Sequence, residues 1–160
     1  MEITNKNIAK LLREAAACYK IKDETSNRFQ IIAYEKAADS IESLTNDVKD
    51  LYEDNKLSTI PGVGPAIAGH LEEFIKTTRV KHFDNLKKGL PLGMFSLLEI
   101  PGVGAKTAYK LGKEFKLEDP DLALNKLEKA ILDHKIAKLT GFGEKSEDLI
   151  KENIRRFKEK

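Results

Sequence analysis

Three short stretches of the sequence pair two glycines with a following helical pattern, and each could present free backbone amides to a phosphate group. They read IPGVG at 60–64, IPGVG at 100–104 and LTGFG at 139–143. Glycine permits positive φ and lets another backbone approach closely. The first turn of a helix carries unpaired N–H groups at the positive end of its dipole. Such a turn can bind a phosphate oxygen but cannot read a base edge, so the pattern predicts binding without sequence specificity.

The candidate binding residues are the glycines of these turns and the polar residues that follow the second and third turns. They are Gly62, Gly64, Gly102, Gly104, Lys106, Thr107, Lys110, Lys113, Gly141, Gly143, Lys145 and Ser146. The three lysines after the second turn are spaced i, i+4 and i+7, which places them on one face of a helix. No lysine follows the first turn before Lys76. We therefore expect copies two and three to contribute more electrostatic affinity than copy one.

Two simpler interpretations of the same pattern remain open. A single Gly-x-Gly can serve only to turn the chain between two helices, and a lysine face can be merely solvated. Three copies in one register favour phosphate binding, because each has an apolar residue before the turn and a helix after it. The first glycines of the copies stand at 62, 102 and 141.

Helical periodicity alternates with short turn signals along the chain, which predicts an all-α protein built from tandem helix-hairpin-helix units. We expect helices over about 5–19, 28–44 and 47–55, the first capped by Thr4 or Asn5 and the third by Asn46. The second should bury an apolar side that includes Phe29 and Ile32. We expect two small subdomains, 1–85 with the first hairpin and 86–160 with the second and third. Helices are also expected over 82–91 and 119–134, the latter capped by Asp119.

Composition and charge limit the classes of protein that this sequence can encode. The net charge of the 160 residues is +2, with 9 basic and 11 acidic residues in 1–56 and therefore 19 and 15 in 57–160. The basic surplus thus lies where the glycine turns are. The single Cys18 excludes a disulfide framework and a multi-cysteine zinc site. The short apolar runs predict no membrane span and no secretory signal, hence an intracellular protein.

At this point the chain resembles the N-terminal part of family X DNA polymerases, the group of polymerase beta and the bacterial and archaeal PolX enzymes. The resemblance is carried by RFQIIAYEKAADSIESL, LSTIPGVGPAIAGHLEEFI, LLEIPGVGAKTAYKL and LTGFGEKSEDLI. It implies DNA binding in DNA repair, such as base excision repair. The first hairpin would face the 5′-phosphate side of a gap or nick, and the second would grip the primer-side backbone. Tyr34 matches a tyrosine near the 5′-end pocket, although a packing role fits it equally well.

The resemblance also implies a monovalent cation, Na⁺ or K⁺, bound by backbone carbonyls at the first two turns, with no other cofactor required. By position, these would be the carbonyls of Ser58, Ile60, Val63, Leu98, Ile100 and Val103. The cation would bridge protein carbonyls and a phosphate oxygen.

Two departures from the family make intrinsic catalysis doubtful. The palm, with its aspartates for two metal ions, has no counterpart in this sequence. The family lysine that forms a Schiff base in deoxyribose-phosphate removal is replaced by His70, and a second lysine by His82. Imidazole forms no stable Schiff base, so lyase activity should be absent or very weak, with Lys76 the first suspect if it is present. His70 could instead contact DNA.

The sequence thus predicts a monomeric module that binds the phosphate backbone of gapped, nicked or branched DNA. One alternative is that the chain is part of a complete polymerase or is a 5′-deoxyribose-phosphate lyase. Another is a helix-hairpin-helix module that binds proteins and whose turns do not bind DNA. Partners would be DNA and either a polymerase palm domain or repair proteins.

Overall fold

The structure, a computed structural model, describes residues 2–160, and over that range it contains helices, turns and loops but no strand. The all-α prediction is confirmed. The chain divides into two compact units between Lys88 and Gly89. None of the helices in the described range is long and apolar enough to cross a membrane.

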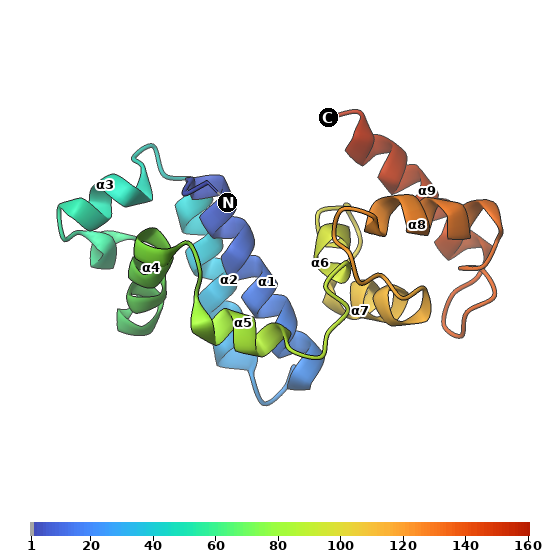
Figure 1. The fold of residues 1–160 in the computed structure, drawn as a ribbon, viewed down its shortest axis with the longest axis horizontal. Helices are drawn as coiled ribbons and strands as arrows, with labels where there is room; N and C mark the ends of the chain where they lie inside the picture. Colours follow the sequence, from blue (N-terminus) through green and yellow to red (C-terminus); the bar gives the residue numbers. More distant parts are fainter. Residues whose placement is uncertain (1) are drawn as a thin grey trace. The chain divides into compact units, whose positions relative to one another are not determined.

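Unit 1 packs its helices around two long neighbours, α1 and α2, which lie side by side with α5 against α1 (Figure 1). Its elements are α1 (Asn5–Asp23), α2 (Arg28–Glu42), α3 (Val48–Glu53), a 3₁₀ turn η1 (Leu57–Thr59), α4 (Pro65–Thr77) and α5 (Lys81–Lys87). Thr4 caps α1 by accepting the Asn7 amide at 3.1 Å, as its position before the helix predicts. The fully buried Ile8 and Leu12 give α1 an apolar stripe that faces the core.

A carboxylate and an ammonium group tie α1 to α5. Glu14 is only 7% exposed, and its Oε1 lies 2.6 Å from the Lys87 Nζ. A buried carboxylate needs a charged or hydrogen-bonding partner, because its desolvation is otherwise costly. The pair therefore fixes how α5 lies along α1.

Three details of unit 1 differ from the sequence-based expectations. α1 continues four residues past Tyr19, and α3 is capped by Asp47, whose side chain accepts the Lys49 amide, and not by Asn46. More importantly, Phe29 and Ile32 do not join the core: they are 78% and 53% exposed. The core side of α2 is instead formed by Ile31, Tyr34, Ala37, Ala38 and Ile41.

Unit 2 contains four helices, two of which begin directly after a glycine turn (Figure 1). They are α6 (Met94–Leu97), α7 (Ala105–Glu114), α8 (Ala123–Leu132) and α9 (Glu144–Lys158). α6 packs on α7 and α8, and α8 packs on α9. The expected start of α8 at Asp119 was wrong: the helix begins at Ala123, and the Asp119 carboxylate accepts the Asp121 amide at 2.9 Å in a preceding turn. The short α6 was not predicted.

Candidate nucleic-acid interface

The three glycine turns share one backbone hydrogen-bond pattern. In each, the residue between the glycines donates its N–H to the carbonyl of the apolar residue three positions earlier. These bonds join Val63 to Ile60 at 3.0 Å, Val103 to Ile100 at 3.1 Å and Phe142 to Leu139 at 3.0 Å. The first glycine takes φ of +84°, +81° and +86° in the three copies. A type II turn requires a positive φ at the residue before the N–H donor, and glycine adopts it without strain.

Buried side chains hold the first two turns while their glycines stay on the surface. Ile60 and Ile100 are 2% and 1% exposed, and Val63 and Val103 are each 6% exposed. All four glycines of these turns are exposed. The apolar anchors thus fix the backbone from below and leave its outer side accessible, which is the geometry that phosphate binding needs.

The second glycine of each turn caps the following helix in an extended conformation. Gly64 (φ −91°, ψ −175°) precedes α4, Gly104 (φ −86°, ψ −179°) precedes α7 and Gly143 precedes α9. An added Cβ at any of the three would meet nothing within 4 Å. The space beside the first amides of these helices is therefore open to a ligand, and no cap side chain blocks them.

The third turn differs from the other two in its anchors and its neighbours. Leu139 and Phe142 are only half-buried, where the other copies place buried residues. The Lys110 ammonium of α7 donates a hydrogen bond to the carbonyl of Thr140, and it lies 4.9 Å from the centroid of the Phe142 ring. A charged side chain from the second hairpin thus occupies the third turn.

The second turn receives a side chain from the third hairpin in return. A Cβ built on Gly102 would lie 3.0 Å from the side-chain nitrogen of Asn153, on α9, and one built on Gly141 would lie 3.1 Å from the Lys110 Nζ. Each hairpin of unit 2 therefore places one side chain beside the first glycine of the other, although both glycines stay exposed. No local sequence pattern predicts these two contacts, because they depend on how α7 and α9 pack.

The predicted polar residues after the turns are found on α7 and α9. Lys106 and Lys113 are exposed on α7, with the Lys113 Nζ lying 5.3 Å from the Tyr109 ring centroid, while Thr107 is half-buried. On α9, Lys145 is exposed and Ser146 is half-buried. Lys110 shares the expected face with Lys106 and Lys113 but bends to the third turn, as described above.

The carbonyls proposed for a cation lie at the first two turns. Those of Ile60 and Ile100 each accept one turn hydrogen bond, which leaves a second lone pair on each oxygen. In the described part of the chain, no cluster of three His, Cys, Asp or Glu side chains could hold a metal ion.

Tyr34 and His70 belong to an aromatic cluster of unit 1. The His70 and His82 rings stack at 5.2 Å with 6° between their planes, and the Tyr19 hydroxyl lies 2.7 Å from the His82 Nε2. Tyr34 stacks on Tyr19 at 5.7 Å, and its other neighbour is Phe83, edge-on at 5.6 Å. Tyr34 is 6% exposed, so its ring supports this cluster from inside.

The environment of His70 keeps its imidazole neutral. Burial lowers the pKa of His70, the nearby His82 lowers it further, and Glu73 opposes these two effects in part. A neutral imidazole in this position offers one N–H donor and one acceptor. It can hydrogen-bond to a ligand but does not supply a positive charge at neutral pH.

Neither the position nor the pKa of Lys76 suits a nucleophile. It is exposed, and its Nζ lies 3.0 Å from the Glu72 carboxylate, which raises the pKa of the ammonium group. A Schiff-base lysine needs a lowered pKa so that the free amine is present. The geometry therefore argues against Lys76 in that role.

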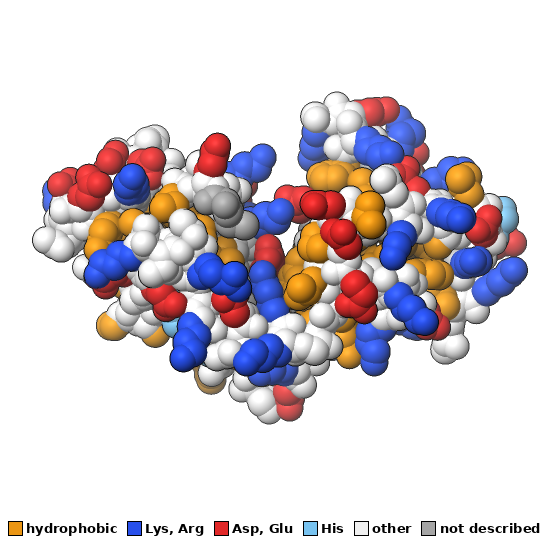
Figure 2. Space-filling model, viewed as in Figure 1, with side chains coloured by type: hydrophobic (Ala, Val, Ile, Leu, Met, Phe, Trp, Pro, Cys, Tyr) orange, Lys and Arg blue, Asp and Glu red, His pale blue; other side chains and the backbone are white. Residues whose placement is uncertain are grey.

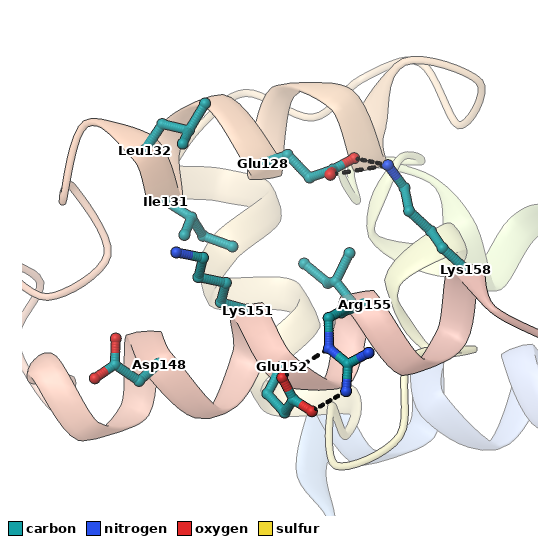
Figure 3. A pocket seen from close by; sticks show the side chains of 9 residues that line it. Glu128, Ile131, Leu132, Asp148, Lys151, Glu152, Arg155 and Lys158 are labelled. Carbon is teal, nitrogen blue, oxygen red and sulfur yellow. Dashed lines mark hydrogen bonds and ion pairs between the residues drawn. The ribbon is translucent and has the colours of Figure 1, made fainter.

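A hollow of about 530 Å³ lies between α8 and α9, beginning one helical turn past the third glycine turn (Figure 3). The buried Ile131 and Ile154 are among its lining residues. Lys158 reaches across to Glu128 at 2.8 Å. Arg155 pairs with Glu152 at 2.5 Å along α9. Three acidic and three basic side chains line this hollow, and two of the basic ones are paired with lining carboxylates, so it has no net positive charge to attract a phosphate.

Known family models cover most of the chain. Residues 3–80 match the helix-hairpin-helix domain, and residues 95–156 match the SAM-like helix-hairpin-helix tandem. The chain is therefore a tandem helix-hairpin-helix protein, with one hairpin in unit 1 and a pair in unit 2.

The resemblance to the N-terminal region of family X DNA polymerases is confirmed. The chain is 32% identical over 145 residues to the DNA polymerase/3′-5′ exonuclease PolX of Bacillus subtilis (strain 168), covering 91% of this chain and 24% of that protein. It is 28% identical over 110 residues to DNA polymerase lambda of Arabidopsis thaliana, covering 67% of this chain and 19% of that protein. The chain thus spans about a quarter or less of the length of these relatives.

Proposed function

We propose that this chain is a DNA-binding module that holds the sugar-phosphate backbone at its glycine turns, without sequence specificity. The observation that carries the proposal is the open, exposed backbone at Gly64 and Gly104, each directly before a helix N-terminus and anchored by buried residues. Family membership supports the same function, because the relatives named above are DNA polymerases.

The geometry at the glycine turns supports this binding, whereas the overall charge of the surface does not. Figure 2 shows Lys and Arg side chains interspersed with Asp and Glu side chains over the visible face of each unit. The net charge is only +2. Affinity should therefore come from a few phosphates held at fixed points, and it should fall as salt rises because each contact displaces counterions.

The test is to place a side chain where the phosphate would approach. Gly64→Val and Gly104→Val should fold normally, because both positions are extended and have nothing within 4 Å of an added Cβ. Each should weaken binding to a duplex oligonucleotide by about tenfold or more, the cost of about one charge-assisted contact. Gly69→Val is the matched control, because Gly69 is an exposed glycine within α4 that also has nothing within 4 Å of an added Cβ. Circular dichroism checks the folding of each variant. Unchanged affinity in both valine variants would refute the proposal.

We further propose that the module prefers gapped or nicked DNA over intact duplex, with the first hairpin at the 5′ side of the break. A monovalent cation would be held by the carbonyls of the first two turns, Ile60 and Ile100 among them. The third turn would not need one, because the Lys110 ammonium already contacts its Thr140 carbonyl. Binding to gapped and intact duplexes in buffers of Na⁺, K⁺ or tetramethylammonium at equal ionic strength tests both points. Equal affinities throughout would contradict them.

The setting would be inside a cell, alongside a polymerase catalytic domain or other repair proteins. Such partners remain part of the proposal, because the chain spans only a fraction of its relatives.

A further inference from the structure

The hollow between α8 and α9 has a charged wall on one helix and a largely apolar wall on the other. The α8 wall presents the buried Ile131, the 73% exposed Leu132 and one carboxylate, Glu128. The volume of about 530 Å³ lies within the range of about 300–1,000 Å³ that ligand-binding pockets have. A large exposed leucine at the edge of such a hollow is a candidate contact for another molecule.

The charged wall is a single row of side chains along α9, which we call the α9 row. Its members, all lining the hollow, are Asp148, Lys151, Arg155 and Lys158. Their spacing of three, four and three residues keeps them on one face of the helix. Figure 3 shows the side chains of Lys151 and Lys158 extending from α9 toward α8. The row therefore presents one negative charge followed by three positive charges, a pattern that has a direction.

The charges of the α9 row are available to a ligand. Asp148 and Lys151 have no charged partner in the part of the chain that the structure describes. The other two basic residues pair with Glu152 and Glu128 across solvent-exposed contacts. Exposed ion pairs stabilise a protein little, so a carboxylate from another molecule can join or replace either one.

We propose that this hollow binds an amphipathic α-helix of a partner protein, lying antiparallel to α9. Docking of a helix in an apolar groove is a recurring mode of protein recognition. The apolar side chains of the partner helix contact Ile131 and Leu132, while three acidic residues and one basic residue face the α9 row. The antiparallel direction places the acidic residues toward the N-terminus of the partner helix and the basic residue toward its C-terminus. This is the distribution that the dipole of that helix favours.

The charge pattern favours a protein helix over a nucleic-acid strand. A strand carries only negative charges, and it would meet the carboxylates of Glu128, Asp148 and Glu152 along the hollow. A helix can place a basic residue opposite Asp148 and acidic residues opposite the rest of the row. The inference rests on the proposed function, which includes partner proteins, and it gives them a surface that no residue of the glycine turns lines.

The experiment uses a synthetic peptide of about 16 residues, a length at which an alanine-rich sequence can form a helix in water. Its charged residues follow the order Glu-x-x-Glu-x-x-x-Glu-x-x-Lys, which matches the α9 row in the antiparallel direction, and leucines occupy the adjoining face. Fluorescence anisotropy of the labelled peptide should show saturable binding to the native chain. A charge-reversed peptide, with three lysines and one glutamate at the same positions, should bind at least about tenfold more weakly, because like charges then face one another.

Three variants of the chain test both walls of the hollow. Leu132→Ser should weaken binding of the peptide about tenfold, because an apolar contact is lost. Lys151→Glu should weaken it about fivefold, and changing the third glutamate of the peptide to lysine should restore the affinity of that variant. Lys126→Glu is the matched control, because Lys126 is an exposed residue of α8 that does not line the hollow. Since all three positions are exposed, circular dichroism should show native folding.

The position of the peptide and the binding of DNA separate the outcomes. Amide NMR shifts on adding the peptide should fall in 128–132 and 148–158, and shifts confined to the glycine turns would overturn the inference. So would a lack of saturable binding, or equal affinity for the charge-reversed peptide.

Binding of a duplex oligonucleotide should be unchanged in Leu132→Ser and Lys151→Glu. If Lys151→Glu weakens duplex binding as much as peptide binding, the α9 row serves nucleic acid and the inference is wrong. If the native chain binds the peptide but no duplex, DNA binding fails and the docking site stands.

Discussion

The ammonium group of Lys110 donates a hydrogen bond to the carbonyl of Thr140, thirty residues further along the chain. The first residue lies on the helix of the second hairpin and the second residue lies in the turn of the third. Lys110 therefore has a structural task in unit 2, although its spacing from Lys106 and Lys113 suggests a uniform phosphate-binding face.

This relationship predicts different effects for two lysines on one helix. Lys110→Met should lower the free energy of unfolding of unit 2 by about 1 kcal/mol, because the Thr140 carbonyl loses its donor. It should also speed amide exchange across 139–143. Lys113→Met should leave stability unchanged and reduce the slope of log affinity against log salt by about 0.9, the value for one lost phosphate contact. Urea denaturation and salt titrations of duplex binding measure the two effects. The assignment is wrong if the two variants behave alike.

The buried carboxylate of Glu147 should be a second support of the third hairpin. It is 3% exposed, and it accepts the Ala137 amide and the His134 Nδ1, each at 2.8 Å. Glu147→Ala leaves the Ala137 N–H unpaired and should cost about 1–3 kcal/mol of unfolding free energy. Glu147→Gln keeps one acceptor oxygen and should cost less. Asp148→Ala, an exposed neighbour, is the control and should have no measurable effect by urea denaturation.

The lowered pKa of His70 should make unit 1 less stable in mild acid. The unfolded imidazole takes up a proton near pH 6.5, whereas the native imidazole resists it because of burial and the adjacent His82. The unfolded state therefore binds more protons as pH falls, and the free energy of unfolding drops from about pH 7 to about pH 5. NMR titration of the imidazole C–H signals should show one histidine with a pKa below 6.5, and its signal should vanish in His70→Gln. A His70 pKa at or above that of a free histidine would contradict this prediction.

The native chain should not form a covalent adduct with abasic-site DNA when borohydride is added. Lys76 is held as a charged ammonium by Glu72, and imidazole at His70 forms no stable Schiff base. His70→Lys should introduce trapping, because the rings of His82 and Phe83 at 5.2 and 5.0 Å would surround the new amine, and burial lowers the pKa of an amine. Efficient trapping by the native chain, lost in Lys76→Ala, would instead identify Lys76 as the nucleophile.

The repeated turns could be predicted from the sequence because they depend on local rules. Glycine at positive φ, an apolar anchor on either side and a helix start are set by neighbouring residues, and the structure has the same hydrogen bond in all three copies. The helical class followed from apolar periodicity in the same way. Local rules also gave the Thr4 cap, although they misplaced the start of α8 by ignoring the turn that Asp119 forms.

Features that depend on packing between distant elements were not predictable. Phe29 and Ile32 have helical spacing that fits a core stripe as well as it fits a solvent face, and only the packing of α1 on the other side of α2 decides between them. The Lys110–Thr140 bond and the approach of Asn153 to Gly102 likewise join residues that are thirty or more positions apart. A single sequence contains no local signal for such pairs.

The exchange of side chains between the second and third hairpins also limits how this protein can be taken apart. A protein engineer who transplanted residues 97–114 into another scaffold would leave behind Asn153, and would carry Lys110 away from its acceptor. An insertion that separated α7 from α9 would remove Asn153 from Gly102 and Lys110 from Gly141 at once. In evolution, too, the two hairpins of unit 2 should have been gained, duplicated or lost together, whereas the hairpin of unit 1, whose Gly62 packs on Lys36 of α2, could change independently.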